Sequence, residues 1–291
     1  MSAPAAFAQQ LARARELLSP CRLCPRQCRV KRIEGETGFC RIGATAVVSS
    51  AGPHFGEESC LVGAGGSGTV FFAGCNLGCV FCQNYDISHH AFGRPQSPED
   101  IAETMMGLAE LGCENINFVT PTHVAPQLMA AIDLARRKGL SKPIVWNCGG
   151  YESLEALGQL DGFVDIYMPD FKYAACDPAR RFSGAEDYPQ VARAALKEMQ
   201  RQVGDLMLVD GVARRGLLVR HLVLPNGLAG SKDTINFLAD EVSPNTYVNV
   251  MGQYRPEFRA CEHPELSRRP TPDEIAEARG YAHLRGLRLA N

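Results

Sequence analysis

Short apolar runs alternate with amphipathic stretches from residue 69 to the end of the chain. Between the runs, apolar side chains recur at helical spacing, as Ile101, Met105 and Leu108 do. The runs are rich in Val, Ile and Phe, which favour strands, and they occupy residues 69–73, 115–120, 143–147, 163–168, 217–224 and 246–251. The pattern predicts six strands, each followed by a helix, and therefore a parallel sheet with right-handed crossovers.

Signals for the ends of helices support this division. Residues 97–100 (Ser-Pro-Glu-Asp) and 271–274 (Thr-Pro-Asp-Glu) each place a capping hydroxyl before a proline, with an acidic residue at the third helical position. Gly139, Gly204 and Gly286 stand where the helices should stop. At least one end of each of four predicted helices is thus marked independently of the apolar pattern.

Six such units can close in two ways, as a doubly wound sheet or as an incomplete barrel. They occupy residues 65–291, fewer than the ~250 residues typical of an eight-unit barrel. In either architecture, functional side chains gather at the carboxyl ends of the strands. Residues 1–64 are predicted to form a second domain, an N-terminal cysteine-rich module that begins with a short helix within residues 1–20.

Charge and hydropathy exclude several classes of protein. The 30 Lys and Arg residues nearly balance the 32 Asp and Glu residues, for a formal net charge of −2. Nucleic-acid arms and polybasic membrane patches need clustered positive charge, so we expect neither a nucleic acid nor a membrane as partner. No apolar run reaches the ~18 residues of a membrane helix, and residues 1–20 lack an export pattern. We expect a cytoplasmic protein.

The chain has twelve cysteines, and seven of them lie in two groups. Cys75, Cys79 and Cys82 follow the first predicted strand at spacings of three and two intervening residues. Clustered thiolates in a chain without an export signal indicate a soft metal. Three thiolates would leave one iron of a four-iron cluster open to a small molecule. The alternative is a zinc site completed by a distant ligand.

The second group lies in the N-terminal module. Cys21, Cys24, Cys28 and Cys40 supply four thiolates, which are enough to close a metal site without further ligands. Zinc and a second four-iron cluster are both compatible with this ligand set. Four separate buried cysteines are the alternative without a metal.

The group at residues 75–82 resembles a known signature. Three cysteines at this spacing, with an aromatic residue at Phe81, resemble the loop of the radical S-adenosylmethionine (SAM) superfamily. Residues 79–85 are similar to homologues of the pyruvate formate-lyase activating enzyme. The resemblance implies an α/β fold with a partial (β/α)6 TIM-like barrel. It also implies a [4Fe-4S] cluster and reductive cleavage of SAM to a 5′-deoxyadenosyl radical.

The resemblance also suggests partners. A glycyl-radical protein would be the substrate, and flavodoxin or ferredoxin would supply the electron. One alternative is radical modification of a small metabolite or another macromolecule, and another is a non-catalytic zinc- or cluster-binding module. Only 15 residues, 83–97, separate Cys82 from Pro98, which leaves no room for the ferredoxin-like insert of some glycyl-radical activases.

By the same resemblance, residues at the strand ends should contact SAM. The second strand ends in 120–123, where activating enzymes carry a Gly-Gly-Glu-like segment that this chain lacks. Tyr254 and Arg255, near the end of the sixth strand, are the candidates for contact with the substrate. The expected SAM contacts are Phe81, Thr120, Thr122, Asn147, Asp170, Lys172 and Gln253.

Overall fold

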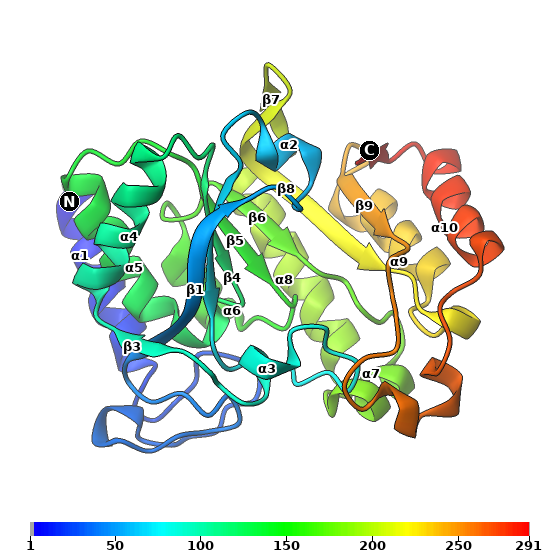
Figure 1. The fold of residues 1–291 in the computed structure, drawn as a ribbon, viewed down its shortest axis with the longest axis horizontal. Coiled ribbons are helices and arrows are strands. Elements are labelled where there is room, and N and C mark those ends of the chain that lie inside the picture. Colours follow the sequence, from blue (N-terminus) through cyan, green and yellow to red (C-terminus); the bar gives the residue numbers. More distant parts are fainter. Residues whose placement is uncertain (1–2, 291) are drawn as a thin grey trace.

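The computed structural model describes residues 3–290, which contain a single ten-stranded sheet (Figure 1). The six predicted strands are all present: β2 (Ser67–Phe72), β4 (Ile116–Val119), β5 (Ile144–Cys148), β6 (Ile166–Pro169), β8 (Val212–Leu222) and β9 (Tyr247–Met251). They are parallel and stand in the sheet in the order in which they occur in the chain. A doubly wound sheet reverses its strand order at a switch point, so this sheet is a partial barrel.

Four further strands, which the apolar pattern did not predict, extend the sheet. They are β1 (Ala46–His54), β3 (Arg94–Gln96), β7 (Met207–Val209) and β10 (Arg288–Leu289). β1 runs antiparallel to β2, and β3 runs antiparallel to β1 beyond it. In the described part of the chain β3 and β10 form the two ends of the sheet and do not pair with each other, so the barrel stays open.

Ten α-helices in residues 3–290 connect or flank these strands: α1 (Ala3–Glu16), α2 (Ser59–Val62), α3 (Tyr85–Ser88), α4 (Pro98–Glu110), α5 (Ala125–Arg137), α6 (Leu154–Leu160), α7 (Cys176–Ser183), α8 (Tyr188–Val203), α9 (Ser231–Phe237) and α10 (Pro272–Leu284). Both predicted capping boxes are confirmed, at the starts of α4 and α10. Gly139, Gly204 and Gly286 have positive φ just beyond α5, α8 and α10. None of the helices in residues 3–290 has the length and apolar character needed to cross a bilayer.

Strand β5 shows how the two faces of the sheet differ. Ile144 and Trp146 pack into the main core, which includes residues of the helices α4, α5, α6 and α8. Val145 points to the opposite face and packs with Cys60 and Leu61 of α2. Helix α2 therefore lies against the inner face of the barrel, beside β8 in Figure 1. This leaves the carboxyl ends of the strands as the accessible end of the barrel interior.

The N-terminal residues are tied to the barrel by apolar and polar contacts. Helix α1 packs against α5 and α6, and the Phe7 ring lies 4.9 Å from the Phe163 ring. The Arg32 side chain is buried, and its guanidinium donates to the backbone carbonyls of Gly43 (2.6 Å) and His123 (2.7 Å). A buried charge is tolerated when its donors are satisfied, so Arg32 fixes the N-terminal segment against the end of β4.

We expect stability to fall in mild acid because of two buried histidines. Burial lowers the pKa of His123 and of His221 to about 4, and a ring nitrogen of each hydrogen-bonds a backbone carbonyl. The unfolded chain binds protons on these rings below a pKa of about 6.5, whereas the folded chain does not until about 4. Lowering the pH from 7.5 to 5 should therefore cost about 2 kcal/mol of unfolding free energy per histidine.

Thermal unfolding of His221→Gln across this pH range checks the expectation. Glutamine retains an N–H donor but does not titrate, so the variant should lose less stability between pH 7.5 and pH 5 than the wild type. The exposed His283 provides the control, and His283→Gln should keep the wild-type pH dependence. Equal pH dependence in all three proteins would contradict the prediction.

Candidate functional site

Cys75, Cys79 and Cys82 lie on one loop, residues 73–84, that directly follows β2 and that we call the cluster loop. Gly74 and Gly78 have φ values of 80° and 68°, which only glycine adopts readily. A Cβ atom on Gly74 would lie 2.5 Å from the Cys40 carbonyl oxygen. The glycines therefore let the cluster loop turn tightly while N-terminal residues pack against it.

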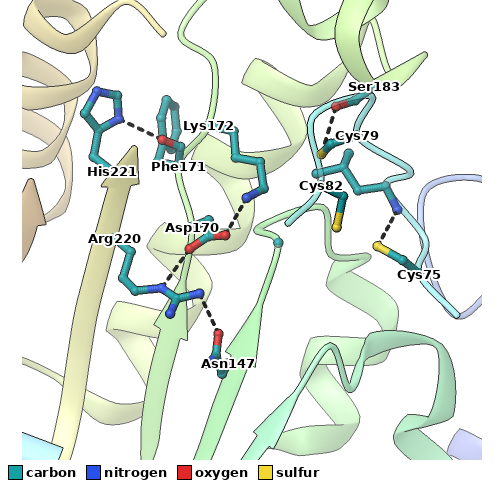
Figure 2. A network of polar contacts seen from close by, with 12 residues as sticks. Cys75, Cys79, Cys82, Asn147, Asp170, Phe171, Lys172, Ser183, Arg220 and His221 are labelled. Atoms are coloured by element: carbon teal, nitrogen blue, oxygen red, sulfur yellow. Dashed lines mark hydrogen bonds and ion pairs between the residues drawn. The ribbon is translucent and has the colours of Figure 1, made fainter. Parts of the chain in front are cut away.

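The three thiols line a cavity of about 260 Å³ at the carboxyl ends of the parallel strands. Each sulfur has a polar neighbour: the Leu77 N–H donates to Cys75 Sγ (3.3 Å), the Ser183 hydroxyl donates to Cys79 Sγ (3.1 Å), and Cys82 Sγ lies 3.1 Å from Ser88 Oγ. Figure 2 shows the three thiols on this loop, with Ser183 approaching Cys79. Such contacts orient ligands and adjust the charge on sulfur.

The electrostatics of the loop suit a bound metal centre. Burial, with smaller contributions from Cys79 and Cys82, raises the pKa of Cys75 to about 12. Burial also raises the pKa of Cys79, against the opposing effect of the Lys172 charge. Free thiolates are therefore disfavoured here, whereas thiolates neutralised by iron are not. In residues 3–290 no three His, Cys, Asp or Glu side chains are grouped around a single ion position. A cluster of four irons needs ligands that stand farther apart than those of a single ion.

A buried ionic network faces the thiols across the cavity. Lys172 Nζ lies 2.5 Å from Asp170 Oδ2, and Arg220 Nε lies 2.8 Å from Asp170 Oδ1. Arg220 also donates to Asn147 Oδ1 at 2.8 Å (Figure 2). Burial alone would raise the pKa of Asp170, but Arg220 and Lys172 outweigh it and lower that pKa. Asp170 pairs with both cations, and Glu57 Oε2 also lies 3.9 Å from Arg220 Nη1, so the network joins two cations to two carboxylates.

Most of the expected SAM contacts meet at this cavity. Thr120 has a φ of 59°, which is rare for a β-branched residue, so the chain is strained where β4 reaches the site. The Tyr254 ring lies 5.7 Å from the Phe81 ring, and its hydroxyl donates to the Leu266 carbonyl. The expected residues that line the cavity are Phe81, Thr120, Asn147, Asp170, Lys172, Gln253 and Tyr254.

Two of the expected residues do not line the cavity. Thr122 is buried, and its hydroxyl donates to Glu152 Oε1 at 2.5 Å. The Thr122 hydroxyl is thus directed at Glu152 rather than into the cavity. Arg255 is exposed and pairs with Glu257 at 2.8 Å, so it stands outside the cavity.

The structure adds residues that the sequence did not reveal. Arg220 lies on β8, and Glu57, in the turn between β1 and α2, approaches it to 3.9 Å. Ser183 is the last residue of α7 and reaches Cys79 across 104 positions of sequence. A charged residue inside an apolar strand was a signal for Arg220, since such a residue needs a buried partner. Nothing in the sequence indicated the contact of Ser183.

This chain is similar to known proteins that identify its family. The radical SAM superfamily matches residues 69–212, which begin in β2 and include the cluster loop. The uncharacterized protein MJ0674 of Methanocaldococcus jannaschii is 34% identical over 285 residues, covering 95% of this chain and 78% of that protein. The chain belongs to the radical SAM superfamily. Its cofactors are therefore a [4Fe-4S] cluster and SAM.

Two further proteins resemble this chain. The uncharacterized protein MJ0808 of the same organism is 26% identical over 92% of this chain and 79% of its own length. Among solved structures, a radical SAM methyltransferase from Sphaerobacter thermophilus has a similar fold, with a TM-score of 0.53 and 14% identity. That alignment covers 76% of this chain and 65% of the methyltransferase. The likeness extends to the fold alone.

We expect Ser183→Ala to make the catalytic cluster of this radical SAM protein harder to reduce. The hydroxyl of Ser183 donates to Cys79 Sγ, and hydrogen bonds to cluster sulfurs stabilise the reduced state. Losing a bond worth about 1 kcal/mol should lower the midpoint potential by roughly 40 mV. An EPR-monitored redox titration measures this, and Ser267→Ala, at an exposed position, is the control. An unchanged potential at full iron content would contradict the role of Ser183.

Proposed function

We propose that this protein is a glycyl-radical-enzyme activase-like member of the superfamily, which takes a hydrogen atom from the backbone of a protein substrate. The observation that carries the proposal is the lining of the cavity, which joins the three thiols to the exposed residues Gln83, Asn84 and Gln253. The cavity therefore opens to solvent beside the thiols. The reacting C–H group of a substrate can enter from outside through this opening, as a narrow polypeptide segment would.

Two loops frame the mouth of the cavity and support this proposal. The stretches 83–88 and 251–254 each contribute residues to its lining, and aromatic side chains lie within the first stretch and just beyond both. The Tyr85 ring stacks on the Phe258 ring at 5.2 Å, and the His89 ring lies 4.4 Å from Phe258. Arg255, three positions before Phe258 in the chain, is exposed, and a guanidinium suits the carbonyl groups of a peptide. The mouth thus offers apolar and hydrogen-bonding surface to an extended chain.

The chemistry follows from the cofactors. When bound, the cluster supplies one electron that breaks an S–C bond of SAM, giving methionine and a 5′-deoxyadenosyl radical that takes a hydrogen atom from the substrate. Cys75, Cys79 and Cys82 would hold the cluster. Lys172 and Arg220 would attract the carboxylate of SAM, and Asp170 would accept a hydrogen bond from its ribose.

The electron has to come from outside this chain. Flavodoxin and ferredoxin are the classes of donor that we propose, because the cleavage needs one electron at low potential. None of the twelve cysteines, all of which lie within residues 3–290, forms a disulfide, which fits a reducing compartment such as the cytoplasm. We expect neither a membrane nor a nucleic acid to take part.

The first test concerns SAM cleavage. Under anaerobic conditions the reduced protein with SAM should yield 5′-deoxyadenosine and methionine, measured by chromatography and mass spectrometry. Cys79→Ala should reduce the yield to background, because the cluster loses one of its three ligands. Cys261→Ala removes an exposed thiol outside both groups and should leave the yield unchanged. Persistent cleavage by Cys79→Ala would refute the assignment of the cluster loop.

A second test concerns the substrate. Mixing the reduced protein and SAM with candidate glycyl-radical proteins should produce a persistent glycine-centred EPR signal. Omitting SAM, or using Cys79→Ala, should abolish the signal. If SAM is cleaved normally but no candidate shows the signal, the activase proposal fails. Radical modification of a small metabolite or another macromolecule then takes its place.

A further inference from the structure

Hydrogen bonds bring the four cysteines of residues 17–45, which we call the head segment, close together. The Cys21 N–H donates to the Val30 carbonyl at 2.8 Å, and the Arg29 N–H donates to the Cys21 carbonyl at 3.1 Å. These two bonds bring the chain that follows Cys28 back beside Cys21. The Phe39 N–H donates to Cys28 Sγ at 3.3 Å, which places Cys40 next to the same group. Cysteines up to 19 positions apart in sequence therefore converge.

The chain between Cys28 and Cys40 folds back onto Cys28. A Cβ atom on Gly38 would lie 2.8 Å from Cys28 Sγ, so the residues just before Cys40 pack directly on that sulfur.

The backbone of the head segment is strained around the cysteines. Gln27, Arg29 and Arg41 have φ values of 41°, 59° and 63°, beside Cys28 and directly after Cys40. Such conformations cost about 1–3 kcal/mol each and persist where the surroundings enforce them. The local core is small and centres on Leu17, Leu18, Cys21 and Leu23. Metal ligation would provide the constraint that this core does not.

The head segment is in direct contact with the cluster loop. Arg26, between Cys24 and Cys28, donates to the carbonyls of Asn76 and Leu77 at 3.0 Å each. Both carbonyls lie between Cys75 and Cys79. The Cys40 carbonyl oxygen packs so closely on Gly74 that a Cβ atom there would come within 2.5 Å. A centre bound by the head thiols would therefore adjoin the catalytic one.

We propose that Cys21, Cys24, Cys28 and Cys40 bind a second [4Fe-4S] cluster, placed directly beside the catalytic cluster. Four thiolates match the ligand requirement of such a cluster. They occupy every iron, so this centre has no position for SAM and cannot replace the catalytic one. Binding of this second cluster does not depend on the catalytic cluster. Only its position next to the catalytic cluster does.

Iron analysis of anaerobically reconstituted full-length protein tests the proposal. The wild type should bind about eight irons per chain, and both the triple variant Cys75→Ala/Cys79→Ala/Cys82→Ala and the double variant Cys24→Ala/Cys28→Ala should bind about four. Cys176→Ala/Cys261→Ala, which removes two cysteines outside both groups, should still bind about eight. The triple variant reports on the head segment alone, so the test stands even if the double variant does not fold.

EPR spectroscopy of the reduced proteins adds a readout of proximity. Two adjoining paramagnetic clusters should broaden each other's signals in the wild type, and the triple variant should give a single uncoupled spectrum. Loss of all iron from the triple variant, or one zinc per chain in place of the second cluster, would overturn the proposal. SAM cleavage does not enter these measurements, so failure here is distinct from failure of the proposed function.

Discussion

The structure depends on one buried carboxylate that holds two cations in place. Asp170 stands at the carboxyl end of β6 and pairs with Lys172 on its own loop and with Arg220 from β8. Removing one partner from a buried ionic group costs about 3–5 kcal/mol, since the remaining charges are left uncompensated. Without Asp170 the two cations would repel each other, and the arrangement of positive charge opposite the thiols would be lost. The ionic network therefore sets the electrostatic character of the cavity.

The barrel supplies the geometry for this network. Six strands of the sheet are parallel neighbours, namely β2, β4, β5, β6, β8 and β9. Their carboxyl ends therefore meet around a single cavity. Helix α2 packs against the inner face of the sheet, so the cavity opens toward the strand ends. The head segment then packs against the cluster loop through Arg26 and the contact of Cys40 with Gly74. Both groups of cysteines thus belong to one continuous structure at this end of the molecule.

Prediction from sequence succeeded where local signals are strong. The six parallel strands and the capping boxes at Ser97 and Thr271 follow from periodicity and from residue types with specific backbone roles. It failed for β1, whose residues 46–54 are mostly small or polar and carry no alternating pattern. Antiparallel pairing with the next strand, β2, makes that segment a strand, which its own residue types do not indicate.

The sequence by itself determined the superfamily, the order of strands and helices, and which cysteines form two groups, because each of these depends on spacing along the chain. Only the tertiary structure decided which side chains face the cavity. Arg220 lines it and Ser183 hydrogen-bonds to Cys79 at its edge, while the Thr122 hydroxyl points to Glu152. The physical reason is that side-chain direction at a strand end, and contacts between distant segments, are set by packing and by the pairing of buried charges.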